Sequence, residues 1–165
     1  MNTEQFWAIL DDLQGEAPEG ELRNRLELLD PEDLLGFQEL FDNAVDAAYD
    51  WNLWAAAYII DGGCSGDRFT DFRYGLIARG KMIYDRALKD ADSLADVASD
   101  EEDGEIANEE FGYVAQEVYQ SKTGEDLPRV SIGGVGEPTG EQWDFDDSEL
   151  CASRMPRLWA KFGMA

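Results

Sequence analysis

The sequence predicts a mostly α-helical protein, a single compact helical domain over residues 1–165 with a long central helix and little or no β-structure. Apolar residues recur at spacings of three and four along most of the chain, which is the period of helices that bury one face. The chain is 44% hydrophobic and 12% aromatic, so its 165 residues can bury a core of the size that one domain needs. We therefore do not expect the chain to be disordered.

The first helix is expected to begin at Asn2 or Thr3, because either side chain can accept a hydrogen bond from an unpaired backbone N–H. Gly15 ends this helix. A turn at residues 17–20 then leads into a second, shorter helix. The leucines of its apolar face lie four and three residues apart: Leu22, Leu26 and Leu29.

The longest predicted helix begins with Asp30 as its cap and Pro31 at the first helical position. Its apolar residues alternate spacings of four and three: Phe37, Phe41, Ala44, Ala48, Trp51, Ala55 and Tyr58. The glycines of residues 62–63 end it, since glycine most easily adopts the left-handed cap conformation. We expect one helix, continuous to Ile60, at the centre of the fold.

Two helices follow these glycines. Ser65 is the candidate N-cap of the first, and Gly80 ends it. The second has an inward face of four residues: Ile83, Tyr84, Ala87 and Leu88. Residues 90–121 then hold eleven acidic residues and no Lys or Arg. Their centre, near residues 99–105, is expected to be an exposed acidic loop, because so dense a charge could not be buried.

The last part of the chain is less regular. One more amphipathic helix is indicated by its apolar face: Phe111, Val114, Ala115, Val118 and Tyr119. Residues 123–142 form an irregular segment, in which residues 130–132 are a possible short strand. A short helix is expected around Leu150, and the side chains of Leu158 and Trp159 are expected to dock on the core.

Acidic residues dominate the charge, with 37 Asp and Glu against 13 Lys and Arg and a net charge of −24. Such a charge repels nucleic-acid phosphates and anionic membranes, so neither is an expected partner. No apolar run is long enough to cross a bilayer, and no basic and apolar leader opens the sequence, which predicts a cytoplasmic location with two reduced cysteines. The lack of histidine excludes histidine-based catalysis, metal ligation and pH switching.

The most unusual segment is residues 60–69, which places glycines, a thiol, a hydroxyl and two acids between two apolar helices. A helix beginning at Ser65 would offer N–H groups to an anion and could lower the pKa of the Cys64 thiol. The favoured interpretation is a tight turn in which Cys64 packs as a small apolar residue and Ser65 caps the helix. The glycines match neither the phosphate-binding loop nor the dinucleotide fingerprint.

Carboxylates offer a second kind of candidate site. Asp61 and Asp67, near the turn, are the best-placed pair for a divalent metal or for acid–base chemistry. Three further acids share one helix face, where a solvated surface is the favoured interpretation: Asp42, Asp46 and Asp50. We therefore predict no metal and no cofactor.

Six of the 13 basic residues fall within residues 68–89, which hold only two acids. Arg73 lies on the apolar face of its helix, so an anion site is possible here. Internal pairing with the acidic helices is favoured, since a buried arginine needs a carboxylate partner. Trp51 and Trp54 are interpreted as core residues first and as a ligand cage second.

The central part of the chain resembles a bacterial family catalogued as the domain of unknown function 4240. The segments that carry the resemblance are residues 51–60, residues 62–65, Phe69, residues 71–73, Gly80 and residues 92–95. We trace it from Phe6 to residues 156–159, nearly the whole chain. Gly66 stands where we expect a second acid after the Cys-Ser pair, which weakens any role that needs paired carboxylates there. The resemblance implies a small cytoplasmic bacterial domain and brings no activity with it.

The favoured function is a non-enzymatic protein-interaction module whose acidic surface binds a basic protein partner, as an immunity protein or an antitoxin does. The alternative is an enzyme or small-ligand domain with a pocket at the turn, lined by five residues: Trp54, Cys64, Ser65, Asp67 and Arg73. A third hypothesis is a mimic of DNA, in which carboxylates replace phosphates. A concave site beside the turn with accessible Arg73 or Asp67 would favour the pocket, and burial of these two against each other would count against it.

Overall fold

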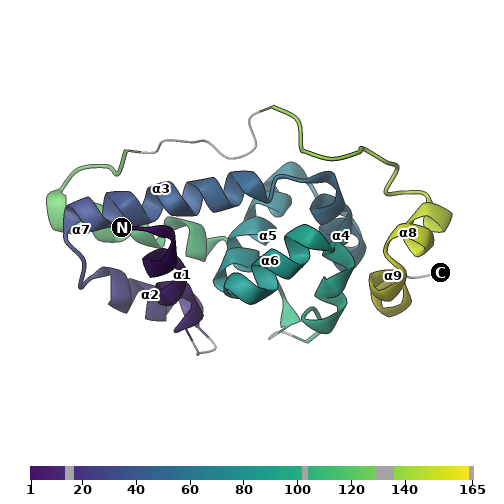
Figure 1. Ribbon diagram of the computed structural model, residues 1–165, viewed down its shortest axis with the longest axis horizontal. Coiled ribbons are helices and arrows are strands. Elements are labelled where there is room, and N and C mark those ends of the chain that lie inside the picture. Colours follow the sequence, from purple (N-terminus) through teal and green to yellow (C-terminus); the bar gives the residue numbers. More distant parts are fainter. Residues whose placement is uncertain (14–16, 102–103, 129–135, 164–165) are drawn as a thin grey trace.

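The computed structural model describes residues 1–13, 17–101, 104–128 and 136–163. These residues form helices joined by loops, so the predicted mostly α-helical fold is confirmed (Figure 1). In chain order the elements are α1 (Thr3–Asp11), α2 (Pro18–Leu26), α3 (Pro31–Ala47), α4 (Trp51–Asp61), α5 (Gly66–Ala78), α6 (Lys81–Lys89), the 3₁₀ helices η1 (Ala91–Asp96) and η3 (Glu110–Tyr113), α7 (Val114–Thr123), α8 (Ser148–Arg154) and α9 (Pro156–Phe162). Within these ranges, no helix is long and apolar enough to cross a membrane.

The helix α3 lies parallel to the long axis of the molecule, with α1, α2 and α7 beside it and with α4, α8 and α9 beyond its C-terminal end (Figure 1). At one end α7 packs against α2 and α3, and at the other α9 packs against α4, α8 and η1. Rings from three elements, α1, α3 and η3, meet in the core, where Phe37 lies 5.1 Å from Phe6 and 6.2 Å from Phe41 between ring centroids. Phe41 in turn lies 6.1 Å from Phe111.

The prediction of one continuous helix to Ile60 is wrong, because the structure breaks it between α3 and α4. The Asp50 carboxylate accepts a hydrogen bond from the backbone N–H of Leu53, 3.0 Å away, and so caps α4. Thr139 donates its N–H to the Tyr49 carbonyl and accepts the N–H of Trp51, at 2.8 and 3.0 Å. The apolar period continues across the break because both helices face the same core.

Two other expectations about burial are also wrong. Asp42 was assigned to a solvated face, but it is only 3% exposed and accepts a hydrogen bond from Gln38 Nε2 at 2.8 Å. The reason is that α3 is packed against α1, α5 and α7, so few of its faces meet water. Leu88 was placed on the inward face of α6, but it is 38% exposed. It lies in the last turn of that helix, beside an open hollow of about 260 Å³, whereas Tyr84 and Ala87 are buried as expected.

The predicted ends of α5 are confirmed. Ser65 Oγ accepts the N–H of Arg68 at 3.2 Å, and Gly80 adopts a positive φ of 96° just after the helix. In the acidic loop, the described acids Asp100 and Glu101 are exposed. The possible strand at residues 130–132 lies outside the described residues.

Candidate functional site: an aromatic cleft beside the Cys64 turn

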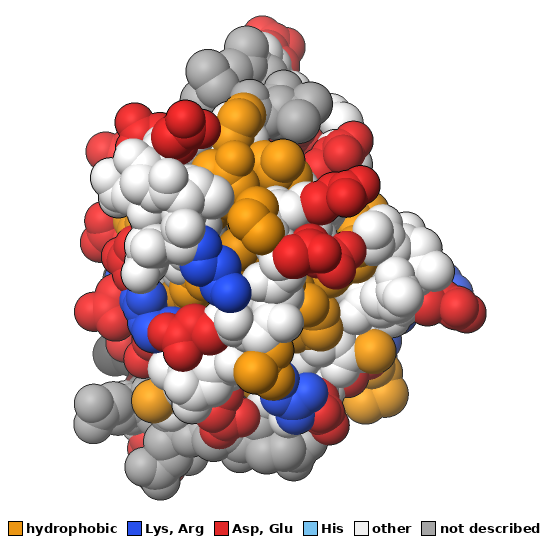
Figure 2. Space-filling model, turned by 90° about the vertical axis from the view of Figure 1, so that its left-hand side faces the viewer, with side chains coloured by type: hydrophobic (Ala, Val, Ile, Leu, Met, Phe, Trp, Pro, Cys, Tyr) orange, Lys and Arg blue, Asp and Glu red, His pale blue; other side chains and the backbone are white. Residues whose placement is uncertain are grey.

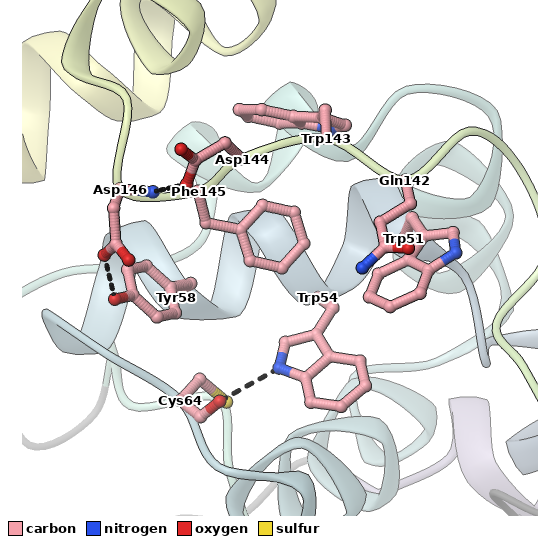
Figure 3. A pocket seen from close by; sticks show the side chains of 9 residues that line it. All are labelled: Trp51, Trp54, Tyr58, Cys64, Gln142, Trp143, Asp144, Phe145 and Asp146. Carbon is pink, nitrogen blue, oxygen red and sulfur yellow. Dashed lines mark hydrogen bonds between the residues drawn. The ribbon is translucent and has the colours of Figure 1, made fainter.

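A cleft of about 640 Å³ lies between α4, the turn that follows it and a C-terminal segment (Figure 3). We call it the aromatic cleft and define it by the residues that line it: Trp51, Trp54, Tyr58, Cys64, Gln142, Trp143, Asp144, Phe145 and Asp146. Its volume is that of sites that hold a small molecule or an inserted side chain.

The helix α4 supplies the first wall because its aromatic residues are spaced three and four apart, which places them on one helix face. The rings of Trp51 and Trp54 are nearly parallel, with centroids 5.6 Å apart. Trp54 also stacks on Phe69 of α5 at 4.9 Å. The indole Nε1 of Trp54 donates a hydrogen bond to the Cys64 carbonyl at 2.9 Å. Trp54 therefore holds the turn against α4 and exposes only part of its ring.

Residues 142–146 supply the opposite wall. The ring of Phe145 points toward α4 and lies among the other aromatic side chains of the cleft (Figure 3). Its centroid is 5.7 Å from that of Tyr58, 6.1 Å from that of Trp51 and 5.2 Å from that of Trp143. The indole N–H of Trp143 donates to the side chain of Asn52 at 3.1 Å, which ties this wall to α4.

Two exposed carboxylates lie at the edge of the aromatic cleft. The Tyr58 hydroxyl donates a hydrogen bond to Asp146, and this bond to a carboxylate raises the pKa of the tyrosine above its usual value. Asp144 accepts the backbone N–H of Asp146 at 2.9 Å, which shapes the segment locally. The described lining residues include two carboxylates and no Lys or Arg, so the side chains that line the cleft carry net negative charge.

The Cys64 thiol is not activated. Burial and the carboxylate of Asp61 raise its pKa to about 11, although Arg68 acts in the opposite direction. Its S–H donates to the neighbouring Ser65 carbonyl at 3.6 Å. The less favoured possibility that the start of α5 lowers this pKa is therefore not realised, because burial and a nearby carboxylate raise it. The thiol stays protonated at neutral pH, where only a thiolate would be an effective nucleophile.

Arg73 does not line the cleft. It is 1% exposed, and its guanidinium lies 4.7 Å from the ring centroid of Tyr49 and 4.9 Å from that of Phe69. It donates to the Val45 carbonyl at 3.0 Å and to the Thr70 hydroxyl at 3.2 Å. Burial lowers its pKa from the usual value of arginine. Arg73 therefore joins α3 to α5 from the inside, behind the aromatic cleft.

The structure brings together only two of the five residues that the sequence assigned to a pocket, Trp54 and Cys64. Ser65 is used as a helix cap, and Asp67 is exposed in the first turn of α5. Asp67 and Arg73 are not buried against each other, because one is exposed and the other enclosed. Sequence reasoning missed Tyr58 and residues 142–146 as parts of the site. The alternation of aromatic and acidic residues at 143–146 was the signal that could have found them.

At least three of the six basic residues in residues 68–89 form ion pairs within the molecule, so the predicted internal pairing is confirmed only in part. The described contacts of the buried Arg73 are with two rings, a carbonyl and a hydroxyl, and they do not include the carboxylate partner that the sequence predicts. Arg68 forms ion pairs with Asp61 at 3.0 Å and with Glu105 at 2.7 Å. Arg86 pairs with Asp96 at 3.2 Å, and Lys81 of α6 pairs within its own helix. These pairs and the burial of Arg73 reduce the positive charge that the segment offers to an anion. Among the described residues there is no group of three or more potential ligands that could hold a metal ion.

Part of the aromatic cleft lies in the region of the chain that matches a known protein family, and part lies beyond that region. Residues 1–121 match the family described as "Protein of unknown function (DUF4240)". The chain belongs to the DUF4240 family. The match covers α4 and the Cys64 turn and ends before residues 142–146, so it is shorter than the resemblance traced to residues 156–159. No curated protein and no solved structure matches this DUF4240 chain.

Proposed function

We propose that this DUF4240 protein is a non-enzymatic interaction module that binds a basic protein partner in the cytoplasm, in the manner of an immunity protein or an antitoxin. The observation that carries the proposal is the excess of negative charge. The net charge is −24, and at least three of the six basic residues of the main basic segment, residues 68–89, form ion pairs within the molecule. The surplus carboxylates are therefore left for water or for a basic partner.

The surface at the α2 and α7 end of the molecule supports this proposal. Figure 2 shows this end with acidic side chains spread around a strip of hydrophobic side chains and with isolated Lys and Arg side chains. Leu28, two residues after the end of α2, is 84% exposed. An apolar strip with an acidic border is complementary to a partner whose own apolar contact surface has a basic border.

The chemistry of the turn favours binding over catalysis. A chain without histidine has no imidazole to act as general base, and the Cys64 thiol has a pKa of about 11. Covalent catalysis by this thiol would need either a base to deprotonate it or a lowered pKa. The aromatic cleft is better suited to hold a ligand by contact and charge. A small ligand is the second candidate for this site, favoured by the cleft volume of about 640 Å³.

The proposal is tested by capture of partners on the immobilised protein from a lysate of its native cell, at about 0.1 M and about 1 M salt. The Debye length falls from ~10 Å to ~3 Å between these conditions, so electrostatic attraction is largely screened at the higher one. We expect basic proteins to be retained at low salt and released at high salt. The captured protein is then purified, and its association rate is measured against salt.

A pair of matched variants locates the contact. Glu27→Gln with Glu32→Gln removes two exposed charges close to Leu28, whereas Asp100→Asn with Glu101→Gln removes two from the acidic loop. We expect slower association in the first variant and a smaller effect in the second. Capture of no basic protein at low salt, or equal retention at both salt concentrations, would refute the proposal.

A further inference from the structure

We propose that the aromatic cleft is a binding site for a guanidinium group, namely an arginine side chain of the basic partner. This inference rests on the proposed function, which it makes more specific. Three of the lining rings, those of Trp51, Tyr58 and Phe145, are half-buried, so each keeps part of its surface open. Aromatic faces within about 6 Å attract a cation, and the two carboxylates beside them add opposite charge.

The molecule already binds its own guanidinium groups against aromatic rings. In the interior, the guanidinium of Arg73 lies over the neighbouring rings of Tyr49 and Phe69. At the surface, the guanidinium of Arg154 lies 5.2 Å from the ring centroid of Trp143, itself a lining residue, and 3.6 Å from the carboxylate of Glu141. The second arrangement combines an aromatic face with an acid, which are the two features that the cleft offers to a ligand.

The electrostatics of the cleft favour a cation over an anion or a neutral group. Carboxylates raise the pKa of the Tyr58 hydroxyl on one side, and Asp61 contributes to the raised pKa of Cys64 on the other. Burial is the largest cause of the raised pKa of Cys64 and, after the hydrogen bond to Asp146, the second cause for Tyr58, and in both cases the nearby carboxylates act in the same direction and disfavour further negative charge. A guanidinium suits this site better than an ammonium because it is planar, less strongly hydrated and able to form two parallel hydrogen bonds with one carboxylate.

Binding is tested with three capped tripeptides, Gly-X-Gly, in which X is arginine, lysine or citrulline. Citrulline has nearly the shape of arginine and carries no charge. The indole N–H signals of the tryptophans, measured by NMR, report whether binding occurs in the cleft, since Trp51 and Trp54 line it. We expect the arginine peptide to shift these signals with a dissociation constant about tenfold lower than that of the citrulline peptide, with the lysine peptide between them.

Three variants of the full chain complete the test. Trp51→Ala removes an aromatic face and Asp144→Asn removes one charge, and we expect each to weaken binding of the arginine peptide by about threefold to tenfold. Glu149→Gln, in the first turn of α8, removes the same charge from an exposed residue that does not line the cleft, and should leave the dissociation constant unchanged. Circular dichroism confirms that each variant is folded. Asp144→Asn keeps an oxygen that can accept the N–H of Asp146, so it should not disturb the segment.

Equal affinity for the arginine and citrulline peptides, or shifts confined to residues outside the cleft, would overturn the inference. The partner capture separates this failure from failure of the proposed function. If Trp51→Ala retains the salt-dependent partner with unchanged affinity, the cleft is not the arginine site although the protein still binds a basic partner. If the unmodified protein captures no basic partner, the proposed function itself fails.

Discussion

Gly75 marks the closest approach between α5 and the chain that follows the acidic loop. A Cβ atom at this position would lie 1.5 Å from the carbonyl oxygen of Ile106, which no side chain could tolerate. Close to this contact, the N–H of Asn108 donates to the Asp71 carbonyl at 2.9 Å, so backbone meets backbone along this side of the helix. A helix interior is usually a poor place for glycine, and here the packing requires it.

We predict that Gly75→Ala lowers the free energy of unfolding by about 3 kcal/mol, because the backbone segments must move apart to admit the methyl group. Gly20→Ala is the matched control, since Gly20 also lies in a helix but has no neighbouring atom within 4 Å of an added Cβ. Gly20→Ala should raise the free energy of unfolding by up to about 1 kcal/mol. Urea unfolding followed by circular dichroism measures both, and equal stability of the two variants would contradict the prediction.

At the scale of elements, the N-terminus of α9 is capped by a residue from a distant part of the chain. Its N-cap residue, Met155, makes no side-chain cap, and Asp92 of η1 takes that role instead. The Asp92 carboxylate accepts the backbone N–H groups of Arg157 and Leu158 at 3.1 and 2.8 Å, and the side chain is nearly buried. Asp92 thus joins the part of the chain that matches the DUF4240 family to the C-terminal helices beyond it.

We predict that Asp92→Ala lowers the free energy of unfolding by about 2 kcal/mol, because it leaves two backbone N–H groups of α9 without acceptors. Asp92→Asn should lower the free energy of unfolding by less, since its amide oxygen still accepts one of the two N–H groups. Hydrogen exchange of the Arg157 and Leu158 amides should accelerate in both variants. Asp30→Ala, which removes the local cap of α3, is the control: it should reduce stability without first exposing these two amides.

The break between α3 and α4 belongs to the same scale. Asp50 is an N-cap by residue type, yet the apolar period across it indicated one helix. The sequence could not show that Thr139 supplies a hydrogen-bond donor and acceptor at this point. The break matters for the site because it sets where α4 starts, and α4 carries Trp51, Trp54 and Tyr58.

At the scale of the whole molecule, pH should act through the carboxylates that are paired in the fold. Hydrogen bonds from Arg157 and Arg86 hold the pKa of Asp96 below its usual value. The folded pKa is lower than the unfolded one, which is about 3.9. Asp96 therefore stabilises the fold above that pH, and this contribution is lost as the pH falls through the folded pKa.

We predict that stability falls on acidification below about pH 4 and that Asp96→Asn reduces this fall. Asp71 acts in the opposite direction, because burial and Glu109 raise its pKa, so the difference between variant and unmodified protein isolates Asp96. Asp100→Asn removes the same charge from the exposed acidic loop and serves as the control. Thermal unfolding between pH 7 and pH 3 measures the effect, and parallel curves for Asp96→Asn and the unmodified protein would contradict it.

The helical fold, the cap at Ser65 and the family were all predicted from the sequence because each rests on local information. The period of the apolar residues, the capping residues and the spacing of motif residues are all properties of short segments of the chain. The candidate site was predicted only in part, since Trp54 and Cys64 lie close together in the chain. Phe145 lies more than 80 positions further on, and only the folded backbone brings it to them.

The sequence by itself determined the mostly α-helical fold, the excess of negative charge and the unusual turn around Cys64, because composition and period are carried by the residues themselves. The tertiary structure decided which aromatic and acidic residues form the cleft, that Arg73 is enclosed and that the Cys64 thiol has a raised pKa. The physical reason is that burial, hydrogen bonding and electrostatic potential depend on neighbours in space. In this protein those neighbours come largely from segments that are distant in sequence.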